Sequence, residues 1–196
     1  MGIPGSMSQQ RVNMSRVNQL RPFFTPGVRV IDEFRLAAPA ATVTLAGFPQ
    51  YYRTLEIEAS VRSSVAAEGD NIYIFFNADL AANYDYEQLY GIGAGAGSSG
   101  GRGVNTPYIA SIEGANSRAN VFSPVTIKME MYALADREKW AEGRSASFGD
   151  RSADADLILM LRTVAWRSQA AITSIRLDCR TGNFIALSRF TLYGKL

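Results

Sequence analysis

Histidine is absent from the 196 residues of this chain, and cysteine occurs once. Without histidine the chain cannot build a Ser–His–Asp or Cys–His nucleophile, nor a histidine-based zinc, iron or copper site. The single thiol, Cys179, excludes an intramolecular disulfide, and its strand-like surroundings predict an inert, half-buried side chain. These absences favour a protein that uses no metal and no cofactor and is not an enzyme.

Long apolar runs and a strong net charge are lacking as well. No apolar stretch reaches the ~18 residues of a transmembrane helix, and no signal peptide is visible. The formal net charge is only +2, which gives no general attraction to nucleic acid or to a membrane. The first six residues, MGIPGS, are interpreted as a cloning remnant (residues 1–6) ahead of a natural start at Met7.

What the chain does contain is a composition suited to β-strands. Nine tyrosines and ten phenylalanines accompany recurrent threonine and isoleucine, residue types that fit a pleated, half-buried surface. In residues 51–63, Leu55, Ile57, Ala59 and Val61 share one face by a period of two. Comparable strand-like runs occupy residues 41–47, 72–77, 125–134, 157–166, 172–177 and 189–194.

These runs predict an all-β domain over residues 38–196. Roughly eight strands separated by turn signals are best accommodated by an antiparallel β-sandwich of jelly-roll type. The run at 157–166 is apolar at nearly every position, so we expect it deepest in the core. Residues 85–90 and 136–142 are each expected to form about one turn of helix.

The glycine-rich stretch at residues 91–103 is predicted to be a long mobile loop. It contains a formal GxGxxG at Gly95, Gly97 and Gly100, but the following residues do not begin a helix. A dinucleotide site needs that helix to hold the pyrophosphate. The sequence therefore argues against phosphate binding here.

Residues 7–37 are predicted to form an extended N-terminal arm, ordered by its own domain or by a neighbouring subunit. Pro22 and Pro26 interrupt regular structure, and no clean periodicity is present. Between residues 7 and 31 arginine occurs without any acidic residue, which suits docking onto an acidic protein surface. The residues expected to bind a partner are Arg11, Arg16, Arg21, Phe23 and Phe24.

Carboxylates and tyrosines are the remaining candidates for chemistry or ligand binding. Asp79 with Asp85, or Asp154 with Asp156, could hydrolyse a glycoside if they met in a cleft, but the spacing gives no sign that they do. Asp150 and the latter pair could also coordinate calcium, although the spacing of a known calcium loop is missing. A solvated turn is the simpler reading of both sets.

A sugar-stacking platform is the other possibility. Tyr84 and Tyr86 lie two residues apart and would share a face in an extended segment, and Tyr108 is a third candidate. Core packing or subunit packing is the commoner role of such side chains.

The C-terminal segment AITSIRLDCRTGNFIALSRFTLYG resembles the C-terminal signature of a family of tailed-bacteriophage structural proteins. The matching residues are Ile172, Thr173, Ser174, Ile175, Leu177, Gly182, Asn183, Phe184 and Ser188 to Gly194. Weaker similarity covers residues 75–91. The family often has glycine before the Ser-Arg-Phe, where this chain has Ala186 and Leu187, so we expect a different turn there.

The resemblance implies a virion protein that binds and assembles without chemistry. The expected function is a jelly-roll module that decorates or stabilises the head or tail of the particle, as a homo-oligomer with a trimer favoured. The alternative is a host-receptor or glycan-binding adsorption protein on the same scaffold. Neither nucleic acid nor membrane is expected as a partner.

Overall fold

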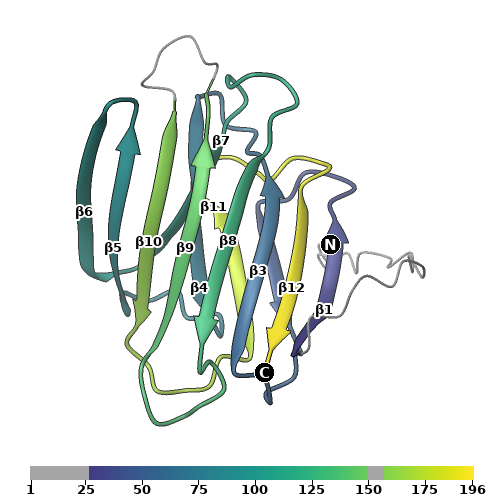
Figure 1. Ribbon diagram of the computed structural model, residues 1–196, viewed down its shortest axis with the longest axis vertical. Coiled ribbons are helices and arrows are strands. Elements are labelled where there is room, and N and C mark those ends of the chain that lie inside the picture. Colours follow the sequence, from purple (N-terminus) through teal and green to yellow (C-terminus); the bar gives the residue numbers. More distant parts are fainter. Residues whose placement is uncertain (1–26, 150–156) are drawn as a thin grey trace, which may run out of the picture.

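The computed structural model describes residues 27–149 and 157–196, and every regular element in these residues is a β-strand (Figure 1). The strands are β1 (Val28–Arg35), β2 (Thr42–Ala46), β3 (Thr54–Val61), β4 (Gly69–Phe76), β5 (Tyr84–Ile92), β6 (Gly95–Val104), β7 (Tyr108–Glu113), β8 (Ser123–Glu130), β9 (Lys139–Ser147), β10 (Ile158–Trp166), β11 (Ser174–Cys179) and β12 (Arg189–Lys195). Within these residues, no helix is long and apolar enough to cross a membrane.

The strands form two antiparallel sheets that pack face to face. The larger sheet has eight strands in the order β1-β12-β3-β8-β9-β10-β5-β6, and the smaller has four in the order β2-β11-β4-β7. Figure 1 shows the larger sheet in front and the smaller sheet behind it. The predicted antiparallel β-sandwich is therefore confirmed.

The topology is that of a jelly roll with an extension. Strands β1-β12-β3-β8 face β2-β11-β4-β7, and the chain passes between the two sets in the order that two Greek keys require. The other four strands, β9, β10, β5 and β6, continue the larger sheet beyond β8. In the sequence, β5 and β6 lie between β4 and β7, and β9 and β10 lie between β8 and β11.

The core lies between the sheets and follows the period-two alternation of the sequence. Side chains of both sheets that are at most 1% exposed include Leu55, Ile57, Ile74, Ile127, Ile175 and Leu177. Cys179 is buried rather than half-buried, and desolvation raises the pKa of its thiol, which keeps it protonated and unreactive.

The free edge of β7 is closed by serine side chains of the larger sheet. Ser145 Oγ accepts a hydrogen bond from the backbone N–H of Ser111 (2.9 Å), and Ser123 Oγ accepts one from the N–H of Glu113 (2.9 Å). All four residues are buried. A buried strand edge would otherwise leave these donors unpaired, so the two serines hold β7 against β8 and β9.

Residues 28–35, expected in the arm, belong to the sandwich as the edge strand β1. It pairs with β12, and Phe34 stacks on Phe190 with ring centroids 5.4 Å apart. A register shift between Val30 and Asp32 breaks the alternation, which explains why the sequence shows no clean period there. Residues 7–26 of the expected arm lie outside the described residues, whereas Leu36, at its other end, is buried in the core.

The glycine-rich stretch is not a loop: residues 95–104 form β6, paired along β5. Two glycines face tyrosine rings of the neighbouring strand. A Cβ on Gly97 would lie 2.7 Å from Cζ of Tyr90, and a Cβ on Gly101 would lie 2.6 Å from Cε1 of Tyr86. The rings lie where side chains of β6 would be, so tyrosines on β5 supply the packing that the glycines lack.

The two expected helical turns are strands as well. Residues 85–90 lie in β5, and residues 139–142 begin β9, where Lys139 points inward and Trp140 outward. The run at 157–166 is only half buried, because the leucines on the outer face of β10 are exposed. In each case tertiary pairing decides the structure of a segment whose local signal is ambiguous.

Candidate functional site

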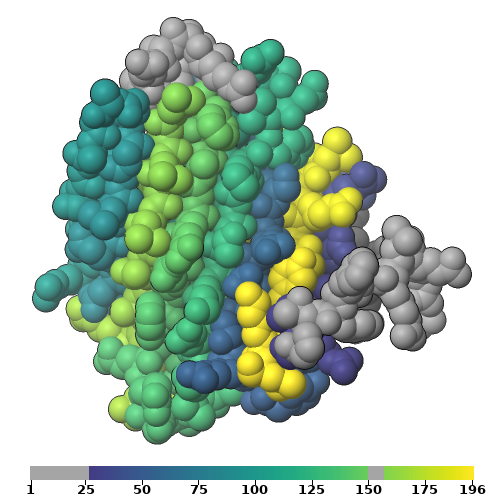
Figure 2. Space-filling model, viewed as in Figure 1, coloured from purple at the N-terminus to yellow at the C-terminus, as the bar shows by residue number. Residues whose placement is uncertain are grey.

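The outer face of the larger sheet carries a row of exposed leucines over β10 and β5. Leu161 lies directly opposite Leu89 in the register, and Leu159 is the next outward residue along β10. Their exposed fractions are 39%, 59% and 67%, respectively. Figure 2 shows this face of the molecule, with β6 and β5 at one side and β1 at the other. Contiguous exposed apolar side chains of this kind mark interaction surfaces.

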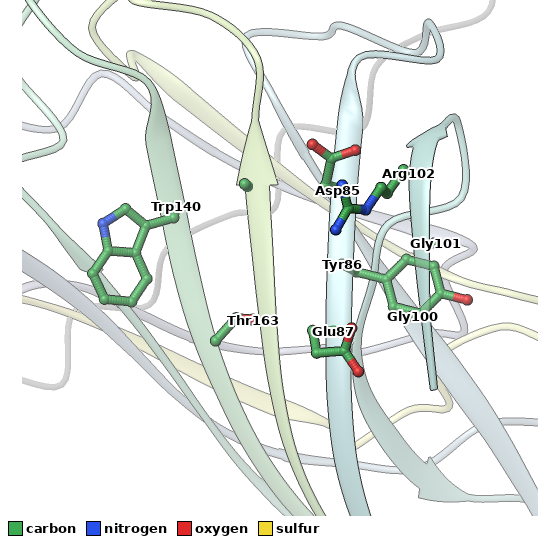
Figure 3. A pocket seen from close by; sticks show the side chains of 9 residues that line it. Asp85, Tyr86, Glu87, Gly100, Gly101, Arg102, Trp140 and Thr163 are labelled. Carbon is green, nitrogen blue, oxygen red and sulfur yellow. The ribbon is translucent and has the colours of Figure 1, made fainter. Parts of the chain in front are cut away.

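A shallow depression of about 750 Å³ lies on the same extension (Figure 3). Trp140 of β9, half exposed, and Thr163 of β10 stand on one side of it, and β5 and β6 supply the other side. Its charged residues have both signs: Glu87 from β5 and Arg102 from β6. The depression therefore combines an aromatic face with acidic and basic groups, which suits a protein surface of mixed charge.

Asp85 at the rim of the depression is held as a carboxylate. Arg167 donates two hydrogen bonds to it, at 2.6 and 3.0 Å, and the backbone N–H of Gly103 donates a third at 2.7 Å. The bonds from Arg167 lower the pKa of Asp85, and the other groups add to this against the effect of burial. A general acid of a glycosidase needs a raised pKa, and the lowered pKa of Asp85 does not suit that role.

Asp79, the other member of the expected carboxylate pair, is engaged elsewhere. Its carboxylate accepts hydrogen bonds from Trp166 Nε1 (2.8 Å), from Asn83 Nδ2 (3.0 Å) and from the backbone N–H of Ala81 (3.0 Å). Burial acts to raise the pKa of Asp79, but these donors outweigh it and lower the pKa overall. Neither carboxylate therefore has the tuning of an acid catalyst.

The acidic residues considered for calcium, Asp150, Asp154 and Asp156, lie outside the described residues. Within the part of the chain that the structure describes, no group of three or more cysteine or acidic side chains is arranged to hold a metal ion. The expected partner-binding residues Arg11, Arg16, Arg21, Phe23 and Phe24 also lie outside it.

Tyr84 cannot be part of a sugar platform, because its side chain is fully buried. Its hydroxyl accepts a hydrogen bond from the backbone N–H of Phe76 (3.0 Å) and donates one to the carbonyl of Asp79 (2.9 Å). Desolvation raises the pKa of Tyr84 well above its ordinary value. The prediction for this residue is wrong, since the inner face of β5 meets the core at this end of the strand.

Tyr86 and Tyr108 do come together, from β5 and β7. Their rings meet edge to face with centroids 5.4 Å apart, and both residues are partly exposed. Two guanidinium groups lie over the ring of Tyr108, Arg162 at 5.4 Å and Arg180 at 5.7 Å from its centroid. A role of these two tyrosines in binding a glycan stays a prediction.

The residues of the C-terminal signature are used by the fold itself. The N–H of Gly182 donates to Oδ2 of the buried Asp70 (2.9 Å), and a Cβ at position 182 would fall 2.3 Å from Ser63 Oγ. Phe184 is buried and packs edge to face on Phe190, with centroids 5.3 Å apart. These contacts close the sandwich.

No protein-family model matches this sequence, and no curated protein matches it. Among solved structures, the carbohydrate recognition domain of Emp47p is similar at a TM-score of 0.33 and 9% sequence identity. The alignment covers 89% of this chain and 100% of that domain. A likeness of this size carries no argument about function.

Two features were missed by the sequence reasoning, the row of leucines and the buried Arg162. Both lie in the run at 157–166, where period two places Leu159 and Leu161 on one face and Arg162 with Met160 on the other. A charge in an apolar strand is a signal that the sequence does contain. It argues against burial of the whole run, which is what the apolar composition alone predicts.

Proposed function

We propose that this chain is a non-enzymatic structural protein of a tailed-bacteriophage particle, in which the jelly roll decorates or stabilises the head or tail as a homo-oligomer. The row of exposed leucines carries the assembly part of this proposal. The C-terminal resemblance supports a phage particle as the place where the protein acts. The signature residues hold the sandwich together, which fits a family whose members share a structural scaffold. A virion location and the absence of catalysis are parts of the same proposal.

A second copy of this chain is the partner that we propose for the leucine face. Both signs of charge surround the row: Glu142 and Arg144 form an ion pair at 2.6 Å on β9, and Glu87 lies nearby on β5. A face with intermixed acid and base is complementary to a copy of itself, whereas nucleic acid or an anionic membrane would require a basic face. A trimer is the favoured state.

The first test is the mass of the full chain in solution, measured by light scattering over a range of concentrations. We expect an oligomer for the wild type and a monomer for Leu159→Glu, because a carboxylate buried in an apolar interface is costly. The matched control is Leu134→Glu, which changes an exposed leucine outside the row. A monomeric wild type, or a Leu159→Glu variant that assembles normally, would contradict the assembly proposal.

The second test concerns residues 7–26 and the particle. A chain that lacks these residues retains β1 and the whole described sandwich. We expect it to lose association with the phage particle while it still forms the homo-oligomer. Normal particle binding by the truncated chain would show that Arg11, Arg16, Arg21, Phe23 and Phe24 are not the docking residues.

Adsorption to a host receptor or glycan is the second candidate, favoured by the contact between Tyr86 and Tyr108. The test is binding of the wild type to host envelope and to a glycan array, with Tyr108→Ala as the variant. Binding that is lost in the variant would support adsorption, and absence of any binding would leave assembly as the sole proposal.

A further inference from the structure

A second hollow, a groove of about 450 Å³, lies on the inner side of the extension, where the larger sheet passes β7 of the smaller sheet. Gln88 and Tyr90 of β5 and Arg162 of β10 line it from one side, and Asn71 of β4 and Ser111 of β7 line it from the other. It does not include the leucine row. Several polar side chains lie among the apolar ones that line it, which is unusual for the space between two sheets.

Arg162 is the unusual group in this groove, because its side chain is buried and has no acidic partner within residues 27–149 and 157–196. The residue is 3% exposed, and none of the acidic side chains in the described residues forms an ion pair with it. Its Nη1 donates to the carbonyl of Ala110 (3.1 Å), and its Nη2 donates to Asn71 Oδ1 (3.0 Å). These neutral acceptors leave the positive charge uncompensated.

Desolvation lowers the pKa of Arg162 to about 10, so the guanidinium remains charged at neutral pH despite its burial. The ring of Tyr108 beneath the guanidinium does not replace a counter-ion, because an aromatic face offers a cation only its quadrupole. Asp70 also lines the groove, but its Oδ2 accepts from Ser63 Oγ and Gly182 N, and its Oδ1 from Asn71 N. Its carboxylate is thereby engaged away from Arg162.

Two of the residues that line the groove each have a buried polar atom without a hydrogen-bond partner among the described residues. One is Nε of Arg162, a donor, and the other is Oε1 of Gln88, an acceptor. Arg162 and Gln88 are direct cross-strand neighbours in the register of β10 and β5. A complementary ligand must therefore present an anionic acceptor and, close beside it, a donor such as a hydroxyl.

We infer that this groove binds a hydroxylated carboxylate, an acidic sugar of the uronate type, with the carboxylate on Arg162 and a hydroxyl on Gln88. A charge-assisted bond to Nε compensates the buried cation, and the hydroxyl satisfies the amide oxygen. Ser111 and Asn71 offer further polar contacts, and the ring of Tyr90 supplies an amphipathic wall. The inference does not depend on the assembly function, and either can fail without the other.

The sharpest variant is Gln88→Glu, which places a carboxylate of the chain itself opposite Arg162. Cross-strand neighbours lie close enough for this glutamate to occupy the ligand's position. The variant should fold, because it adds a counter-ion to a buried charge. Gln88 Nε2 donates a hydrogen bond to Ser99 Oγ (2.6 Å), and the glutamate can instead accept one from the Ser99 hydroxyl. Arg162→Met removes the buried cation itself. The matched control for loss of a positive charge is Arg137→Met, which changes an exposed arginine outside the leucine row and the groove.

The full chain is titrated with sodium glucuronate, glucose and sodium acetate, and binding is followed by the amide shifts of Gln88 and Ser111 in NMR spectra. We expect glucuronate to bind with a dissociation constant on the order of 1 mM, acetate to bind at least roughly tenfold more weakly, and glucose to cause no shift. Gln88→Glu and Arg162→Met should each weaken glucuronate binding roughly tenfold or more, and Arg137→Met should not.

Three results would overturn the inference. Absence of glucuronate binding at roughly 50 mM would mean that water satisfies the two unpaired atoms. Equal binding of acetate and glucuronate would mean that the groove takes simple anions and recognises no sugar. Undiminished binding by a folded Gln88→Glu variant would place the ligand elsewhere on the molecule.

Discussion

Gly194 lies directly beneath the ring of Tyr52, so closely that a Cβ at position 194 would fall 2.4 Å from Cδ2 of the tyrosine. Tyr52 is buried, and Gly194 sits in β12 between β1 and β3. Neither strand can move to make room, because both are paired with β12 along their length. The last glycine of the C-terminal signature is therefore required by packing.

Gly194→Ala is expected to reduce the free energy of unfolding by about 1–3 kcal/mol, the usual cost of overpacking. Urea denaturation measures it. Gly91→Ala is the control, because a Cβ there would meet its nearest atom at 3.8 Å, an ordinary contact. Equal stability of the two variants would show that the ring of Tyr52 moves aside freely.

Leu187 has a φ of 74°, the left-handed conformation that favours glycine. The signature that this chain resembles often has glycine in this link. The side chain of Leu187 is exposed, so its packing contributes little to offset the strained backbone. Leu187→Gly should raise the free energy of unfolding by about 0.5–1 kcal/mol. Leu187→Ala keeps the strain and should show no gain, and a destabilised Leu187→Gly would contradict this account.

Tyr84→Phe should destabilise the sandwich by about 1–3 kcal/mol, because it leaves the N–H of Phe76 and the carbonyl of Asp79 without their buried partner. Chemical denaturation measures the change. The partly exposed Tyr86→Phe variant is the control and should have a smaller effect on stability. Loss of ligand or particle binding by Tyr84→Phe at full stability would contradict the assignment of Tyr84 to the core.

Asp79 should make stability depend on acid pH. Its hydrogen bonds hold the folded-state pKa below the unfolded value of about 3.9, so the stabilisation is present above that value and is lost as pH falls through the folded pKa. Asp79→Asn should flatten the dependence between about pH 5 and 2. Trp166 fluorescence in a Trp140→Phe background reports the unfolding next to this carboxylate, and an unchanged pH profile would contradict the prediction.

The jelly roll could be predicted from the sequence because its strands carry a strict alternation that only a half-buried sheet explains. Residues 54–61 are the clearest example, with Leu55, Ile57 and Val61 fully buried. The extension could not be predicted in the same way. In β6 the missing side chains are replaced by Tyr86 and Tyr90 from the next strand, and no local pattern records a partner that lies elsewhere in the chain.

The leucine row and the groove both depend on that extension, so neither can be predicted unless the extension is predicted first. The period of two places Leu159 and Arg162 on opposite faces of β10, but it does not say which face is covered. That is decided by β7, whose Ala110 carbonyl accepts from Arg162. The carboxylates are different: their spacing gives no sign of a shared cleft, and in the structure Asp79 and Asp85 are engaged by Trp166 and Arg167, both far away in the sequence.

The extra strands form two antiparallel pairs, β5–β6 and β9–β10. Each pair is inserted in the sequence between two consecutive strands of the jelly roll. Their lengths can change without shifting the pairing of the eight strands that build the closed sandwich. The leucine row lies on this addition, and the groove lies between it and strands β4 and β7. A protein built in this way can alter its contacts and its ligand by exchanging hairpins, while the scaffold that folds it stays constant.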